Sequence, residues 1–187
     1  MQLNSKETYL SVDVEATGPV PGLFSMIDIG IAQVGQIDNT FSASLLELPN
    51  AGWSPGASSF WHRNDHNRRV LTEIQERAQP VQDVMYELNR WLKQFNRPVF
   101  VGFPVAFDFA FVHWYWWYVI KQEPPFSHSG LDGKTLAMLL LKSGYREAGK
   151  RLLKKAIPKR SDLPHTHFGL DDAREQAVLF EQIMERL

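Results

Sequence analysis

Apolar and polar residues alternate along residues 9–15, which read YLSVDVE. A period of two is typical of a β-strand with one apolar face. Two more strands are predicted at 26–34 and 40–48, with Asp38 and Asn39 in the turn between them. The first part of the chain therefore predicts an antiparallel meander of three strands.

Residues 50–59 are rich in Gly, Pro and Ser and predict a loop. Apolar residues at helical spacing then predict helices over 65–78 and 81–95. A buried strand at 99–103 leads into an aromatic-rich helix at 107–120. The middle of the chain thus alternates between helix and strand.

Residues 126–131 predict a short strand, and three helical stretches follow it. The last helix has an apolar stripe formed by Ala173, Ala177, Phe180 and Met184. A meander followed by an αβα unit and a C-terminal helix predicts an α/β layer architecture with a mixed sheet. The chain has 187 residues, 44% of them hydrophobic, so we expect one domain over residues 1–187.

Asp13 and Glu15 lie on the polar side of the first strand, roughly 6 to 7 Å apart. Two carboxylates that close repel each other when partly buried, so either one takes a proton or a cation neutralises both. Oxygen ligands favour Mg²⁺ or Mn²⁺, although a solvated strand face carries the same residues without a metal. The turn that follows, residues 16–18, would offer backbone N–H groups and a hydroxyl to a ligand.

Further acidic residues and a histidine lie at two predicted helix starts. Asp108 begins the aromatic helix, where it either serves the helix dipole or joins a site. His167 and Asp172 lie on either side of the start of the last helix, and His167 is otherwise a polar loop residue. Asp171 and Asp172 point about 100° apart on a helix, so only one of them can face a site squarely.

Three segments together resemble known motifs. Residues 13–18 (DVEATG) are similar to D-x-E-T-T-G, residues 102–108 (GFPVAFD) to G-x-N-x-x-F-D, and residues 167–173 (HFGLDDA) to H-x-A-L-x-D-A. In this order, over nearly the whole chain, they resemble the DEDDh family of 3′→5′ exonucleases, which includes polymerase proofreading subunits, ribonuclease T and oligoribonuclease. The resemblance implies a three-layer ribonuclease H-like fold.

The resemblance also implies a role for each acidic residue. Asp13, Glu15 and Asp172 would hold one Mg²⁺ or Mn²⁺ with the attacking water, while Asp13 and Asp108 would hold a second about 4 Å away at the leaving 3′ oxygen. His167 would accept the proton of that water. The expected activity is removal of nucleoside 5′-monophosphates from the 3′ end of single-stranded nucleic acid.

The chain departs from the motifs at Ala16, Pro104 and Gly169. Pro104 lacks the amide of the usual asparagine and Ala16 lacks a hydroxyl, so these changes affect substrate positioning. Two other functions stay open. One is a proofreading subunit of a DNA polymerase complex. The other, suggested by these departures, is a nucleic-acid-binding module that lost turnover, although the intact set of four carboxylates and a histidine argues against it. A preference for RNA or DNA depends on contact with the 2′-hydroxyl, which no residue type reveals.

Charge and aromatic residues suggest where nucleic acid would bind. Residues 142–160 contain eight basic residues and one acid, in a chain of net charge −1. This segment is either a solvated helix face or a grip for phosphates, and aromatic residues after the third strand either belong to the core or stack on terminal bases. The expected contacts are Ala16, Thr17, Gly18, Phe60, Trp61, Phe107, Lys154, Lys155, Lys159 and Arg160.

Other features concern location and assembly. The absence of cysteine excludes disulfides and thiolate zinc sites, which fits a cytoplasmic enzyme. The apolar stretch 99–120 imitates a membrane span but contains Pro104 and Asp108, so we expect no membrane partner. The helix at 107–120 is apolar around most of its circumference; either other helices of the chain cover it, or a second copy does so in a homodimer through Trp114 and Trp117.

Overall fold

The structure is a computed structural model that describes residues 6–157, 163 and 165–187. The described residues form a five-stranded sheet in the order β3-β2-β1-β4-β5. The strands are β1 (Thr8–Ala16), β2 (Met26–Gln33), β3 (Gln36–Ser44), β4 (Pro98–Gly102) and β5 (Gly130–Asp132). β1, β2 and β3 pair antiparallel, whereas β4 and β5 run parallel to β1. The predicted meander and mixed sheet are confirmed.

The turn between β2 and β3 differs from the prediction. It lies at Gly35, where φ is +79°, and the strands close with Gln33 paired to Gln36. Glycine adopts this left-handed conformation without steric cost. Asp38 and Asn39 were wrongly expected in the turn; they lie inside β3, which begins and ends four residues earlier than predicted.

The helices are α1 (Pro55–His62), α2 (Asp65–Arg77), α3 (Val81–Leu92), α4 (Val105–Val119), α5 (Gly133–Leu141), α6 (Lys150–Ala156) and α7 (Gly169–Arg186). The prediction of a loop over residues 50–59 was wrong in its second half, where α1 begins. Ser54 caps this helix by accepting the N–H of Ala57 at 3.1 Å, and Pro55 occupies the first turn. Serine followed by proline is a helix-start signal that composition alone obscured.

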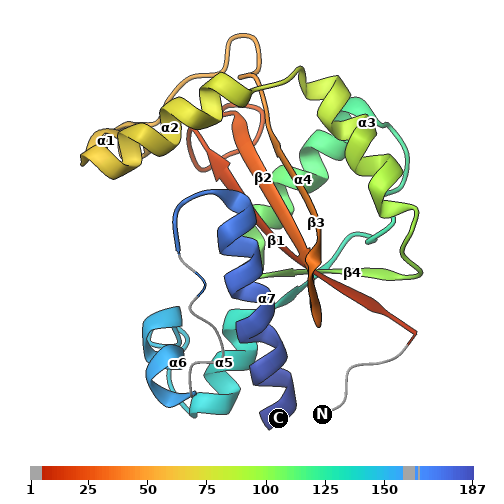
Figure 1. The fold of residues 1–187 in the computed structure, drawn as a ribbon, viewed down its shortest axis with the longest axis vertical. Helices are drawn as coiled ribbons and strands as arrows, with labels where there is room; N and C mark the ends of the chain where they lie inside the picture. Colours follow the sequence, from red (N-terminus) through yellow and green to blue (C-terminus); the bar gives the residue numbers. More distant parts are fainter. Residues whose placement is uncertain (1–5, 158–162, 164) are drawn as a thin grey trace.

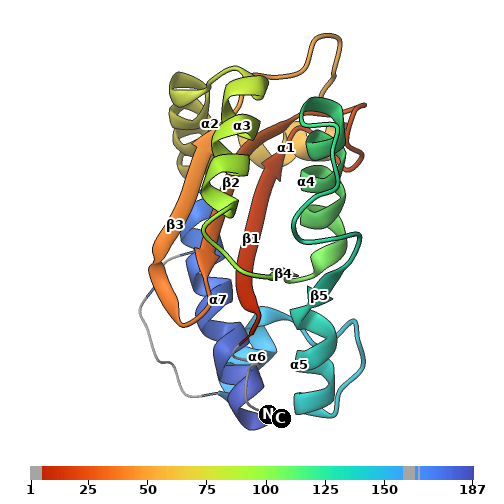
Figure 2. The ribbon, with the colours of Figure 1, turned by 90° about the vertical axis from the view of Figure 1, so that its right-hand side faces the viewer.

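The sheet has helices on both faces (Figures 1 and 2). On one face, Leu10, Val12 and Val14 of β1 belong to a core that also contains the apolar residues of α3 and α4. On the other face, Tyr9 of β1 packs against Phe180 of α7, with ring centroids 5.8 Å apart. Successive strand residues point to opposite faces, so the odd-numbered acids of β1 lie on the side of α7.

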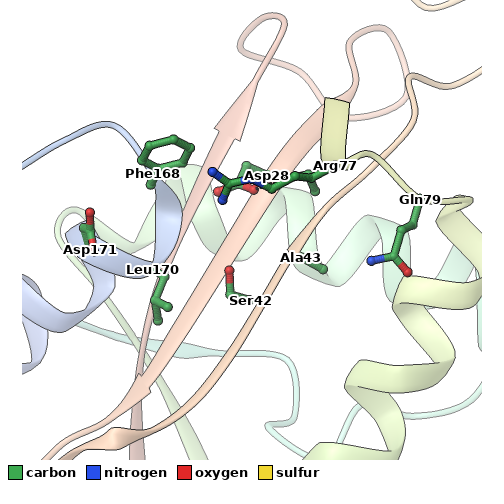
Figure 3. Close-up of a pocket in the computed structure, with 9 residues that line it drawn as sticks. Asp28, Ser42, Ala43, Arg77, Gln79, Phe168, Leu170 and Asp171 are labelled. Atoms are coloured by element: carbon green, nitrogen blue, oxygen red, sulfur yellow. Dashed lines mark hydrogen bonds between the residues drawn. The ribbon is translucent and has the colours of Figure 1, made fainter. Parts of the chain in front are cut away.

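Helix α7 approaches the sheet closely at its N-terminus. A Cβ added to Gly30 would lie 2.0 Å from the backbone of Gly169, so both positions need glycine at this contact. Phe168, the N-cap residue of α7, has no polar side chain, and Asp28 of β2 accepts the N–H of Gly169 at 2.9 Å instead. Asp28 is buried beside a cavity of about 360 Å³, where Arg77 lies over the ring of Phe168 (Figure 3).

The described residues cover the aromatic helix α4 only in part. Trp116 is buried against Phe126, and its Nε1–H donates to the carbonyl of Gln122 at 3.0 Å. Trp117 and Tyr118 remain 40% and 46% exposed. The stretch at 99–120 is β4 followed by α4, and within the described part of the chain no helix is both long and apolar enough to span a bilayer.

Candidate active site

Asp13 and Glu15 lie at the carboxyl end of β1, on the face that α7 covers. Gln176 of α7 donates from Nε2 to Oδ1 of Asp13. Carboxylate oxygens of Asp13, Glu15 and Asp172 all lie within 4.8 Å of one another. Residues from two elements far apart in sequence therefore converge at this point.

Asp108 reaches the same point from α4 because β1 and β4 separate. Their parallel pairing ends at Ser11 and Val101. The N–H of Val14 lies beyond the paired segment and donates to Oδ1 of Asp108 at 3.0 Å. A Cβ on Gly102 would lie 3.2 Å from Oδ2 of Asp108, so a small residue leaves room for the carboxylate. The site thus forms at the carboxyl ends of parallel strands, where open α/β sheets bind ligands.

Asp172 and Asp171 face different sides of α7. Oδ1 of Asp172 accepts the backbone N–H of Thr166 at 3.0 Å and lies 3.0 Å from Nδ1 of His165. Asp171 accepts the hydroxyl of Thr166 at 2.7 Å and lines the separate cavity of Figure 3. Asp172 is therefore the residue of this pair that joins the carboxylate cluster.

His167 lies at the edge of the cluster, with φ of +65°. Its ring packs edge-on against those of Phe60 and His165, at centroid distances of 4.9 and 4.8 Å. Burial and the charge of His165 lower the pKa of His167 below the ordinary 6.5. Hydrogen bonds to Asp172 and Glu175 raise the pKa of His165 to about 9. Near pH 7, His167 is the neutral imidazole of the pair and His165 the charged one.

The carboxylates repel one another strongly in this setting. Burial raises the pKa of Asp13 to about 7, and Asp172 adds to the rise. Burial and the charge of Asp13 raise the pKa of Glu15 and of Asp108 well above their ordinary values. A divalent cation would return these groups to the ionised form, and an all-oxygen ligand set suits Mg²⁺ or Mn²⁺. The residues therefore fit the predicted metal site.

A cavity of about 380 Å³ contains all five predicted catalytic residues in its wall. It is lined by Asp13, Val14, Glu15, Phe103, Pro104, Phe107, Asp108, Lys150, His165, His167 and Asp172. The three sequence motifs thus form one site.

Comparisons with known proteins agree with this geometry, although no family model matches the chain. The 3′-5′ DNA exonuclease Cap18 of Escherichia coli is 31% identical over 185 residues, covering 95% of this chain and 92% of the relative. The nuclease domain of 3′hExo, a DEDDh family member bound to rAMP, has a TM-score of 0.71 at 14% identity, covering 97% of this chain and 93% of that one. The chain belongs to the DEDDh family of 3′→5′ exonucleases.

The ribonuclease H-like fold implied by the motifs is confirmed. Cell-death related nuclease 4 (CRN-4) shares it, with a TM-score of 0.66 at 14% identity over 95% of this chain and 64% of that one. DEDDh exonucleases use divalent metal ions, in keeping with the acidic groups of this site.

Two residues of this exonuclease that depart from the motifs, Pro104 and Ala16, lie close to the site. Pro104 lines the cavity just before α4, where it presents a ring in place of an amide. The N–H of Val105 is accepted by Oδ1 of Asp132, at the end of β5, at 3.1 Å. Ala16 is buried and paired with Met26 at the end of β1. The start of α4 is therefore held by a residue outside the motif.

The turn after β1 does not offer the predicted hydroxyl to a ligand. The Thr17 hydroxyl is buried, donates to the carbonyl of Gly52 at 2.8 Å and accepts the N–H of Ser25 at 2.9 Å. Gly18 is also buried, and a Cβ there would lie 2.4 Å from the ring of Phe24. Thr17 and Gly18 therefore hold the turn between β1 and β2 together, and the Thr17 hydroxyl is already hydrogen-bonded inside it.

The predicted stacking residues divide into buried and accessible ones. Trp61 is 1% exposed in a core cluster with Ile27 and Ile74, so the prediction that it stacks on a base was wrong. Phe60 is partly buried against His167, and Phe107 is 37% exposed in the cavity wall. Phe60 and Phe107 therefore remain candidates for base contacts.

One residue of the basic segment 142–160 lies in the wall of the active-site cavity, and the sequence did not single it out. Lys150 lines the cavity, whereas Lys155 is exposed on α6. Lys159, Arg160 and the side chain of Lys154 lie outside the described residues.

Two residues of α7 were also missed by the sequence analysis. Glu175 and Gln176 follow Asp172 by three and four positions, and at this spacing helical residues share a face. Gln176 contacts Asp13, and Glu175 lies 3.4 Å from Nδ1 of His165. The helical spacing from Asp172 was the signal that could have identified them.

Proposed function

We propose that this exonuclease removes nucleoside 5′-monophosphates one at a time from the 3′ end of single-stranded nucleic acid, with DNA as its preferred substrate. The observation that carries the proposal is the single cavity in which four carboxylates and one neutral imidazole meet. The preference for DNA is supported by Cap18, a 3′-5′ DNA exonuclease.

His167 is the proposed general base, with Asp13, Glu15, Asp108 and Asp172 as the metal ligands. Two bound Mg²⁺ or Mn²⁺ ions would supply charge stabilisation at the attacking and leaving oxygens. His167 is neutral near pH 7 because burial lowers its pKa, so it can accept a proton from water. His165 is less suited to that task because its hydrogen bonds to two carboxylates raise its pKa to about 9.

Phe107 and Phe60 are the proposed contacts for the terminal bases. Phe107 lines the cavity next to Asp108 in sequence, and the ring of Phe60 packs edge-on against that of His167. Stacking on an aromatic ring tolerates any base, as an exonuclease requires. Exposed Lys155 would contact phosphates farther from the scissile bond.

Residues 1–187 are proposed to act as one catalytic domain in the cytoplasm. The exposed Trp117 and Tyr118 on α4 support self-association as a homodimer.

The test uses single- and double-stranded DNA and RNA oligonucleotides of one sequence, labelled at the 5′ end. We expect a ladder that shortens from the 3′ end, free nucleoside 5′-monophosphates, faster degradation of single-stranded DNA than RNA, and complete inhibition by EDTA. Asp13→Asn and Asp108→Asn should abolish the ladder. Release of the labelled terminal nucleotide first, or degradation that survives EDTA, would contradict the proposal.

A further inference from the structure

Lys150 begins α6 and enters the cavity formed by the carboxylates. Its side chain is 20% exposed, and Nζ lies 3.4 Å from Oε2 of Glu175, whose side chain is 6% exposed. Among the described residues that line this cavity, Lys150 carries the only ammonium or guanidinium group. The neighbouring Arg151 is exposed instead.

Lys150 lies close to the carboxylates that would hold the metal ions. Its Nζ is 3.4 Å from Oε2 of Glu175, and the same oxygen is 3.4 Å from Nδ1 of His165, which in turn lies 3.0 Å from Oδ1 of Asp172. The ammonium group therefore lies at the edge of the carboxylate cluster, in the wall of the cavity that it shares with Asp13 and Asp108.

Glu175 of α7 holds the Lys150 side chain in place. It follows Asp172 by three positions, so it lies on the same face of α7. Its Oε2 contacts both Lys150 and His165, each at 3.4 Å. A buried ion pair adds little net stability because both ions lose their hydration. Stabilisation of the fold is therefore a weak reason for this ion pair. Holding a cation beside the carboxylate cluster is a functional reason for it.

We propose that Lys150 is a catalytic residue whose ammonium group contacts a non-bridging oxygen of the scissile phosphate, and that Glu175 is the positioning residue that holds it. This inference rests on the proposed function of the same site. Negative charge is redistributed over the phosphate oxygens during the displacement. A cation that is already held beside these oxygens, in a cavity with little water, stabilises the transition state. The lysine donates hydrogen bonds and transfers no proton.

Lys150→Ala, Lys150→Arg and Glu175→Gln test the assignment on single-stranded DNA with Mg²⁺. We expect Lys150→Ala to lower kcat roughly 10²-fold, the loss typical of one transition-state donor, with KM changed less than about threefold. Lys150→Arg should recover part of kcat, and Glu175→Gln should give an intermediate loss. Arg151→Ala is the matched control, because it removes the adjacent positive charge at an exposed position; it should retain kcat.

Calorimetric titration with Mn²⁺ alone gives a readout that does not require activity. Removing a cation from the carboxylate cluster should leave Mn²⁺ binding at least as tight as in the wild type. A wild-type kcat in Lys150→Ala, an equal loss in Arg151→Ala, or weaker Mn²⁺ binding in Lys150→Ala and Lys150→Arg would overturn the assignment. An inactive wild type would instead contradict the proposed function, and the Mn²⁺ titration would still report whether Lys150 faces the cluster.

Discussion

Replacing Gly169 with alanine tests whether the contact between α7 and β2 positions the proposed metal ligands. The motif that this chain resembles has alanine at the same place, yet Gly169 lies on the backbone of Gly30 here. A Cβ at Gly169 would lie 2.6 Å from the backbone nitrogen of Gly30 and 2.9 Å from the carbonyl oxygen of Asp13. Both neighbours are backbone atoms of the central sheet, so the helix must move instead.

The magnitude follows from these distances. Restoring an ordinary van der Waals separation requires α7 to move by roughly 0.8 Å. Overpacking of this kind costs about 1 to 3 kcal/mol, against at most about 1 kcal/mol gained by removing a helical glycine. Asp172 and Gln176 move with the helix, and a displacement near 1 Å lowers the rate by up to about 10²-fold. We therefore expect Gly169→Ala to lose roughly 10- to 100-fold in kcat. A net cost of about 1 to 2 kcal/mol, at about 2 to 4 °C per kcal/mol, lowers the melting temperature by about 2 to 8 °C.

The assay is single-nucleotide release from labelled DNA, combined with thermal denaturation of the same samples. Gly56→Ala is the matched control, because it makes the same change in the first turn of α1, where an added Cβ meets no described atom within 4 Å. The control should keep the wild-type rate and melt at the same or a slightly higher temperature. Wild-type kcat and melting temperature in Gly169→Ala would refute the reasoning.

Four further predictions follow from the site and the surface. Folding raises the pKa of Asp13 from 3.8 to about 7, so in EDTA the folded state keeps a proton that the unfolded state loses as the pH rises through this range. The free energy of unfolding should therefore fall between these two pH values, by up to about 4 kcal/mol. Melting curves should show that Mg²⁺ stabilises the protein more at pH 8 than at pH 5. At saturating Mg²⁺, His167→Ala should lose roughly 10²- to 10⁴-fold in kcat and should lose the decline in rate that the wild type shows on the acid side, while Mn²⁺ binding persists. Comparable loss in His165→Ala, with His167→Ala near wild type, would reverse the assignment. Lys155→Ala should weaken binding equally for all sequences and reduce the salt slope by up to about 0.7, whereas an unchanged slope would exclude a phosphate contact. Trp117→Glu should convert a dimer to a folded monomer in light scattering, and a wild-type monomer at micromolar concentration would exclude the dimer.

The features that could be predicted from sequence are those set by local spacing. Period-two alternation put Asp13 and Glu15 on one side of a strand, and the position of Asp172 relative to the start of α7 put it in the first turn. The predicted turn at Asp38 was wrong because a glycine three residues earlier forms the reversal without steric cost. The prediction for Trp61 was wrong because stacking and core packing need the same residue type, and only the tertiary structure shows which face α2 covers.

The residues that escaped prediction act between elements rather than within them. Asp28 holds α7 only because β2 lies beneath it, and Asp132 holds α4 only because β5 ends beside it. Neither belongs to a motif, yet both accept a backbone N–H at the start of a helix that carries one of the proposed metal ligands.

The departures from the motifs are best understood in the same way. Pro104 removes an amide that could have contacted the backbone or the substrate, and Asp132 supplies the acceptor for the N–H of Val105. Gly169 removes a methyl group where Gly30 leaves no room for one. Asp108 and Asp172 line one cavity although their motifs carry these changes, so the altered motifs still assemble the carboxylate cluster. A module that only bound nucleic acid would not need this cluster, so its presence argues for an active enzyme.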